Sequence, residues 1–165
     1  MQNSLKKENY QLLIAQAKLL FKKEKNWLAN LSNASAMLNM TLPNSVFTGF
    51  YVFNNQELIL GPFQGGVSCV HIPLGKGVCG ESAQNKATVI VDNVKSYPNY
   101  ISCDSKAMSE IVVPLLLENR LLGVLDLDSS LISDYDDIDK TYLEEFVDIL
   151  VKNTEWPNHF FGEQD

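Results

Sequence analysis

Hydrophobic positions change their spacing twice along the chain. Before Leu42-Pro43, apolar residues recur every three or four positions, which predicts two amphipathic helices that meet near Lys25-Asn26. From Val46 the spacing becomes that of strands, and a helical spacing returns near the C-terminus. The apolar face of the first helix comprises Tyr10, Leu13, Ala17 and Leu20, and that of the second comprises Trp27, Leu31, Ala34 and Leu38.

The middle of the chain predicts a sheet of five or six strands. We expect strands at Val46–Phe53, Glu57–Phe63, Cys69–Ile72, Thr88–Val91, Ile111–Leu117 and Leu121–Asp128. A short helix is expected at Val78–Asn85, and a closing helix carries Ile138, Tyr142, Phe146 and Ile149, with Asp136 and Asp137 near its N-terminus. Residues 92–109 lack a sustained period, and so long a loop is usually functional or disordered. The order of elements predicts an α+β fold in which helices cover an antiparallel sheet.

Composition indicates one globular domain over residues 1–165, with a core at about 26–150 and a loosely held tail at 157–165. The chain is 45% hydrophobic and 20% charged. Its net charge of −7 argues against nucleic acid as a partner. The longest apolar run, Ile111–Leu117, is too short to span a membrane. We see no export signal, so we expect a cytoplasmic location in which the three cysteines are reduced.

Two carboxylates are expected on one face of the last strand. In the run from Gly123 to Asp128, strand alternation puts Asp126 and Asp128 on one side and two leucines on the other. The carboxylates would either face solvent or line a pocket. In a pocket, repulsion and burial would raise at least one pKa and provide a proton donor near neutral pH.

The three cysteines allow either structural or chemical roles. Cys69 and Cys79 suit small buried apolar positions, whereas Cys103 lies in a polar part of the long loop where exposure is expected. A zinc site formed with His71 is an alternative, but the chain has no Cys-x-x-Cys motif. One exposed cysteine, two that could resolve it and nearby carboxylates suggest a reductase that cycles through sulfenic acid and disulfide.

Several segments together resemble the free methionine-(R)-sulfoxide reductases, which are GAF-domain enzymes. The resemblance runs from about Asn26 to Leu150, in one order and with the cysteine spacing kept. It is carried by Gly61–Gly65, Gly75–Gly80, Ile101–Asp104, Ser109–Leu115 and Gly123–Ser129.

The resemblance implies a role for each cysteine and for three carboxylates. Cys103 matches the catalytic cysteine, Cys69 the resolving cysteine, and Cys79 a third that forms a disulfide with Cys69 or assists resolution. Residues that match the substrate-binding and proton-donating acids are Glu110, Asp126 and Asp128. The implied substrate is free methionine-(R)-sulfoxide, and the implied reductant is thioredoxin, an external dithiol, with no bound cofactor or metal. A second copy of the chain is a further candidate partner.

An aromatic contact for the substrate methyl group is expected from Phe47 and Tyr51. The family usually has tryptophan where Phe47 stands, and phenylalanine keeps an apolar face but loses area and an N–H donor. The main rival function is a GAF module that senses a small molecule without catalysis. Against it stand the absence of an attached output domain and of a Cys-His chromophore pair.

Overall fold

The computed structural model describes residues 2–161, and its elements follow the predicted order closely. The elements are α1 (Gln2–Lys23), α2 (Trp27–Thr41), β1 (Ser45–Phe53), β2 (Glu57–Gly65), β3 (His71–Pro73), α3 (Gly77–Asn85), β4 (Val89–Val91), β5 (Ser109–Leu117), β6 (Arg120–Ser129) and α4 (Asp137–Asn153), with a short 3₁₀ turn at Val94–Ser96. The α+β prediction is therefore confirmed.

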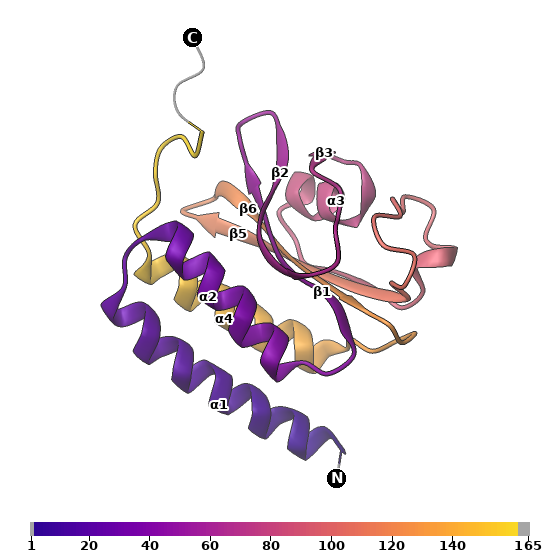
Figure 1. Cartoon of the computed structure of the whole chain (residues 1–165), viewed down its shortest axis with the longest axis horizontal. Coiled ribbons are helices and arrows are strands. Elements are labelled where there is room, and N and C mark those ends of the chain that lie inside the picture. The colour runs from indigo at the N-terminus through magenta and orange to yellow at the C-terminus, as the bar shows by residue number, and fades with distance from the viewer. Residues whose placement is uncertain (1, 162–165) are drawn as a thin grey trace.

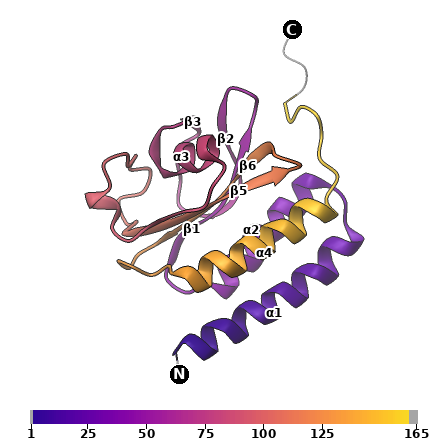
Figure 2. The same ribbon diagram turned by 180° about the vertical axis from the view of Figure 1, so that it is seen from behind.

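The six strands form one antiparallel sheet in the order β3-β2-β1-β6-β5-β4. Helices α2 and α4 pack against one face, and α1 forms an outer layer on both of them (Figure 1). The reverse view shows α4 lying between α1 and the sheet (Figure 2). Helix α3 and the loops around it cover the opposite face.

Local signals explain where the helices begin. The side chain of Asn26 accepts a hydrogen bond from the backbone N–H of Ala29, which caps α2. Asp136 caps α4 and forms a reciprocal capping box with Asp139. These caps fix how α2 and α4 enter the layer that covers the sheet.

The larger hydrophobic core lies between the sheet and the helices. It includes Tyr10, Leu13, Ala17 and Phe21 of α1, which therefore packs as part of the same core. Within the predicted loose tail, Phe160 packs edge-on against Trp27 and Trp156. Residues 162–165 of that predicted tail lie outside the described residues.

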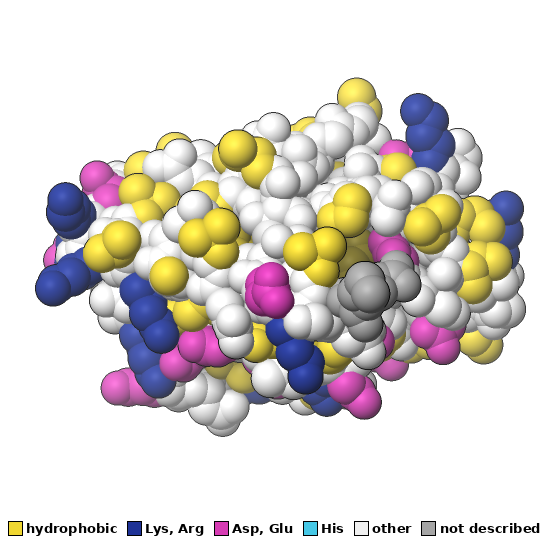
Figure 3. All heavy atoms as spheres, turned by 90° about the horizontal axis from the view of Figure 1, so that it is seen from below, with side chains coloured by type: hydrophobic (Ala, Val, Ile, Leu, Met, Phe, Trp, Pro, Cys, Tyr) yellow, Lys and Arg dark blue, Asp and Glu magenta, His cyan; other side chains and the backbone are white. Residues whose placement is uncertain are grey.

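The outward side of the α1 layer is a mixed surface. Viewed from that side, apolar side chains lie scattered among basic and acidic ones (Figure 3). Leu5, Leu12 and Leu19 are exposed on α1. Within residues 2–161, no helix is both long and apolar enough to cross a membrane.

One predicted strand begins two residues later and ends one residue later than expected, with consequences for the site. The third strand was expected at Cys69–Ile72, but β3 spans His71–Pro73 and pairs with Glu57–Ile59. Cys69 therefore lies in the loop before β3. The backbone carbonyl of Cys69 accepts a hydrogen bond of 2.9 Å from the Tyr51 hydroxyl, an interaction that strand periodicity does not reveal.

Candidate active site

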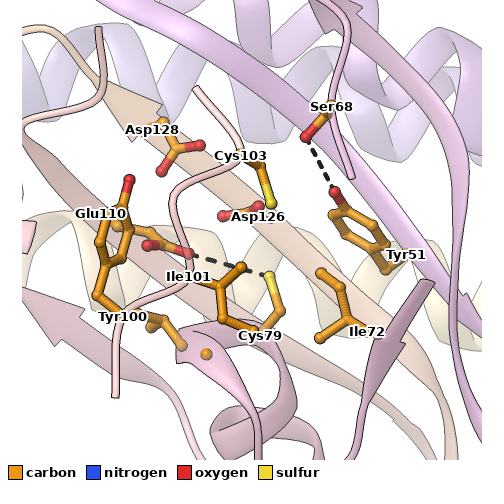
Figure 4. A pocket seen from close by; sticks show the side chains of 12 residues that line it. Tyr51, Ser68, Ile72, Cys79, Tyr100, Ile101, Cys103, Glu110, Asp126 and Asp128 are labelled. Atoms are coloured by element: carbon orange, nitrogen blue, oxygen red, sulfur yellow. Dashed lines mark hydrogen bonds between the residues drawn. The ribbon is translucent and has the colours of Figure 1, made fainter. Parts of the chain in front are cut away.

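A small pocket lies on the sheet face that α3 and its neighbouring loops cover (Figure 4). Strands β5 and β6 form its floor, while the first turn of α3 and the loops before β3 and β5 form its walls. The lining residues are Tyr51, Ser68, Ile72, Gly77, Val78, Cys79, Tyr100, Ile101, Cys103, Glu110, Asp126 and Asp128. Seven of the eight predicted site residues line this pocket or are bonded to a residue that does.

A disulfide joins Cys69 to Cys103 across the mouth of the pocket. It links the loop before β3 to the long loop before β5, with a separation of 5.3 Å between the two Cα atoms. Cys103, expected to be exposed, is half-buried because the disulfide and the pocket wall cover it. Cys69 is also half-buried, and not the buried apolar side chain that a strand position would suggest.

The three predicted carboxylates meet on the floor of the pocket. Glu110 on β5 stands opposite Asp128 on β6, and Asp126 lies two residues earlier on the same strand and same face. Leu125 and Leu127 point to the other face and are fully buried in the larger core. Alternation was thus predicted correctly, and the two carboxylates line a pocket instead of a solvent-exposed face, because Asp126 is only 5% exposed and Asp128 is half-buried.

The carboxylates lie close to one another without a basic side chain to balance them. Among the described residues that line the pocket, none is Lys, Arg or His. Burial raises the pKa of Asp126 to about 6. Burial, together with the charge of Asp126, raises the pKa values of Glu110 and Asp128 well above their usual range. The raised pKa values mean that the cluster keeps its protons to a higher pH than ordinary carboxyl groups do.

One carboxylate oxygen has no hydrogen-bond partner. Within residues 2–161, nothing donates to Oδ1 of Asp126, although this atom is buried. A buried polar atom without a partner is costly, and such atoms are rare in native proteins. The orphaned atom belongs to the floor of the pocket, so a ligand that donates a hydrogen bond would remove this cost.

Cys79 remains a free, buried thiol in the first turn of α3. Its sulfur lies 3.9 Å from Oε1 of Glu110, to which the thiol donates a weak hydrogen bond (Figure 4). Burial raises the pKa of this thiol well above its usual value, and the charges of Asp126 and Glu110 add to the rise. Cys79 is accordingly a neutral hydrogen-bond donor and not a thiolate.

The zinc alternative is wrong, because its four ligands are not brought together. Cys69 and Cys103 are bonded to each other, and His71 lies on the surface with Nδ1 2.8 Å from Oε1 of Glu57. Metal-ligand atoms of Cys79, Glu110 and Asp126 do lie within 4.8 Å of one another. Two members of this second set, Glu110 and Asp126, belong to the carboxylate cluster.

The two predicted aromatic residues occupy different places. Tyr51 lines the pocket, and its hydroxyl lies 3.1 Å from Oγ of Ser68 and donates to the Cys69 carbonyl. Phe47 was expected to contact the substrate, but it is buried behind Tyr51 and lies outside the pocket lining. Its ring stacks on the rings of Tyr51 and Phe63.

Sequence reasoning missed several lining residues, among them Ser68, Ile72, Tyr100 and Ile101. Two of them follow Tyr97-Pro98-Asn99 in the long loop, and Asn99 ties that loop to α3 by donating to the Gly75 and Gly77 carbonyls. A Pro-Asn turn close to a candidate catalytic cysteine is the one signal that could have drawn attention to this segment.

The fold and this pocket place the chain among GAF domains. The model of the GAF domain family matches residues 35–151, from within α2 to within α4. Free methionine-R-sulfoxide reductase from Saccharomyces cerevisiae is 43% identical over 136 residues, which cover 78% of this chain and 76% of the yeast protein.

Solved structures of free methionine-R-sulfoxide reductases are also similar to this chain. The reduced form of fRMsr from Staphylococcus aureus is 46% identical with a TM-score of 0.85, covering 88% of this chain and 94% of that one. Free methionine-R-sulfoxide reductase from Neisseria meningitidis, solved in complex with its substrate, is 40% identical with a TM-score of 0.84 and 87% coverage of both chains. Within the GAF domains, this chain belongs to the free methionine-R-sulfoxide reductase family.

Proposed function

We propose that this protein reduces free L-methionine-(R)-sulfoxide to L-methionine, with Cys103 as the attacking cysteine and Cys69 as the resolving one. The observation that carries the proposal is the position of the Cys69–Cys103 disulfide at the mouth of a pocket whose floor bears three carboxyl groups without a counter-charge. The Neisseria relative, solved with its substrate, supports the same choice of substrate.

The carboxylate cluster explains selection of a free amino acid. The ammonium group of a free amino acid would donate to the cluster and satisfy Oδ1 of Asp126, the atom that lacks a partner among the described residues. A methionine within a polypeptide has no ammonium group and would leave that atom unpaired. The N-terminal end of α3, at Gly77 and Val78, carries partial positive charge and suits the substrate carboxylate.

Reduction requires a proton on the sulfoxide oxygen and two thiols. A carboxyl group of the cluster with a raised pKa supplies the proton, and Cys103 attacks and becomes a sulfenic acid while methionine leaves. The thiol of Cys69 then displaces water from that sulfenic acid and forms the disulfide. Overall, one sulfoxide and two thiols give one thioether, one disulfide and one water.

The disulfide state is the product of one turnover and not the state that binds substrate. The pocket beneath the disulfide has a volume of about 20 Å³, close to the space that one water occupies. An amino acid does not fit there, so the cysteine-bearing loops must separate before the next substrate binds. Thioredoxin, acting as an external dithiol, reduces the disulfide and so returns the protein to the state that binds substrate, without a bound cofactor.

A comparison of substrates, together with substitution of Cys103, tests the proposal. Consumption of NADPH is measured in the presence of thioredoxin and thioredoxin reductase, with the free (R) sulfoxide, the free (S) epimer or an N-blocked sulfoxide as substrate. Consumption is expected with the free (R) epimer alone, and Cys103→Ser should abolish it. Consumption with none of the three substrates, while the cysteines are reduced and a known reductase works in parallel, would favour the ligand-binding alternative.

The resolving role of Cys69 needs its own measurement. Cys69→Ser should still form one methionine per protein in a single turnover but should not cycle with thioredoxin. Full steady-state activity of Cys69→Ser would contradict this role unless Cys79 substitutes for it. The double variant Cys69→Ser/Cys79→Ser separates these two cases, because it removes both candidate resolving thiols.

A further inference from the structure

The free thiol in the pocket wall and two carboxyl groups of the floor form a set of candidate metal ligands. One ligand atom from each of Cys79, Glu110 and Asp126 lies within 4.8 Å of the others. The three residues come from α3, β5 and β6, and the Cys79 sulfur is directed at the Glu110 carboxylate (Figure 4). All three side chains are buried, so the packing of α3 on the sheet fixes their arrangement.

Hydrogen bonds within this set leave its acceptors without enough donors. The single thiol proton of Cys79 is donated to Glu110 over 3.9 Å, and Oδ1 of Asp126 has no donor among the described residues. Asp126 is 5% exposed and lies in a pocket whose described lining has no Lys, Arg or His. A bound cation would therefore balance the charge and give Asp126 the partner that it lacks.

The donor atoms are near the spacing that a tetrahedral ion requires. Zinc binds thiolate sulfur at about 2.3 Å and carboxylate oxygen at about 2.0–2.2 Å, which sets a sulfur–oxygen separation of about 3.5 Å. The Cys79 sulfur and Oε1 of Glu110 are 3.9 Å apart, so they need to approach by about 0.4 Å. The pocket volume of about 20 Å³ has room for one water as a fourth ligand.

The donor types select among divalent cations. Magnesium and calcium prefer oxygen ligands, whereas a thiolate favours softer ions such as Zn²⁺. Binding of the ion displaces the proton of the Cys79 thiol. Because Cys79 lies in the first turn of α3, the N-terminal end of that helix stabilises the thiolate that results.

We propose that Cys79, Glu110 and Asp126 bind one Zn²⁺ ion, and that this ion inhibits sulfoxide reduction by occupying the place of the substrate ammonium group. The two ligands exclude each other, because both require Oδ1 of Asp126. A carboxylate that binds the ion also cannot protonate the sulfoxide oxygen. The inhibitory role rests on the proposed function, whereas binding of the ion does not. The ion is an inhibitor of the protein and not a cofactor.

Binding is tested on the oxidised protein with Co²⁺ as a coloured substitute for Zn²⁺. The disulfide removes Cys69 and Cys103 as ligands, so Cys79 is the one thiol left in the chain. A sulfur-to-cobalt charge-transfer band should appear, saturate at one ion per protein and disappear when Zn²⁺ is added. Mg²⁺ in about 1,000-fold excess should leave the band unchanged, because it does not compete for a thiolate. The lack of a band, or its loss with Mg²⁺, would overturn the site.

Substitutions locate the bound ion. Cys79→Ser and Asp126→Asn should each weaken Zn²⁺ binding by about 100-fold or more, measured by competition with a coloured chelator. His71→Gln is the matched control, because His71 and Glu57 form a rival pair of ligands at the surface. Its affinity should stay within about two-fold of the unsubstituted protein. A loss confined to His71→Gln, or full affinity in Cys79→Ser, would overturn the site. The cobalt band of the unsubstituted protein decides the question if a variant does not fold.

Inhibition is measured in a single turnover without thioredoxin, whose own thiols would bind Zn²⁺. Reduced Cys69→Ser protein is used, because it lacks the pair of thiols at Cys69 and Cys103 that could hold the ion together. One equivalent of Zn²⁺ should slow methionine formation by about ten-fold at low sulfoxide concentration, and more sulfoxide should relieve this inhibition. In Cys69→Ser/Cys79→Ser, Zn²⁺ should slow the reaction by less than about two-fold relative to the rate of that variant without metal.

The outcomes separate the zinc site from the proposed function. Equal slowing of the single and the double variant would assign the inhibition to Cys103 and overturn the inhibitory role of this site. Inhibition that more sulfoxide does not relieve would contradict competition for Asp126. Failure of the proposed function would instead appear as no methionine from the metal-free protein, while the cobalt band still reports on the site.

Discussion

Two buried aspartates, Asp139 in the helical layer and Asp126 on the sheet, differ in the partners that surround their carboxylates. Asp139 is 1% exposed and accepts a 2.6 Å hydrogen bond from the Tyr10 hydroxyl. It also pairs with Lys6 and accepts from the backbone N–H of Asp136. Asp126 is nearly as buried, yet its pocket lining, as far as the structure describes it, offers no cation, and Oδ1 lacks a donor.

This difference distinguishes a structural charge from a functional one. Every contact of Asp139 comes from the chain itself and ties α1 to the start of α4. The environment of Asp126 becomes complete only when a ligand brings a positive charge or a donor. Burial alone is thus uninformative, and the useful observation is which partners the buried group lacks.

The largest expected effect comes from neutralising Asp126. Asp126→Asn should lower kcat/KM for free methionine-(R)-sulfoxide by about 10²- to 10³-fold, since it removes a charge-assisted hydrogen bond to the substrate ammonium. The fold should survive, because asparagine is of similar size. An unchanged kcat/KM in the dithiothreitol-driven reaction would make Asp126 a structural residue like Asp139.

The converse substitution should affect stability and spare catalysis. Asp139→Asn removes the charge that faces Lys6 and weakens the α4 cap, so unfolding in urea should show a loss of about 2 kcal/mol. Because Lys6 still reaches solvent, the loss stays below that of a fully buried pair. The kcat/KM of folded protein should remain within about two-fold of the original value. A large loss of activity in Asp139→Asn protein that is fully folded would show that Asp139 is not a purely structural residue.

The raised pKa of Asp126 should make the stability of the protein depend on pH. The pKa of Asp126 rises on folding to about 6, so the folded state holds its proton more tightly than the unfolded state. Its contribution is fully present at low pH and is lost as pH rises through about 6. Between about pH 5 and pH 7.5, Asp126→Asn should gain on the order of 1 to 2 kcal/mol relative to the unsubstituted protein. A constant difference in urea midpoints across this range would contradict the raised pKa.

Most of the fold could be predicted because its signals are local and periodic. The alternation at Asp126 and Asp128, the break at Asn26 and the cap at Asp136 each act within a few residues. The start of the third strand was predicted two residues too early, since it is fixed by pairing with β2 and by the Tyr51–Cys69 contact. No local pattern encodes those long-range partners.

The site was predictable in its chemistry but not in its geometry. Residue types and the family resemblance indicated the cysteines and the acids, whereas burial of Asp126 and half-burial of Cys103 depend on loops folding over the sheet. Phe47 shows the limit most clearly. Alternation places it on the same side of β1 as Tyr51, but only packing shows that it lies behind the tyrosine.

The smallest expected effect concerns this aromatic pair. Phe47→Leu should cost about 1 kcal/mol of unfolding free energy from lost stacking, while KM for the sulfoxide stays within about two-fold, because Phe47 does not line the pocket. Tyr51→Phe is the matched control: it keeps the ring but loses the hydrogen bonds to Cys69 and Ser68, and kcat/KM should fall about five-fold. A KM that rises more in Phe47→Leu than in Tyr51→Phe would mean that the reduced pocket opens as far as Phe47. The aromatic contact with the substrate methyl group would then include Phe47, as the sequence first suggested.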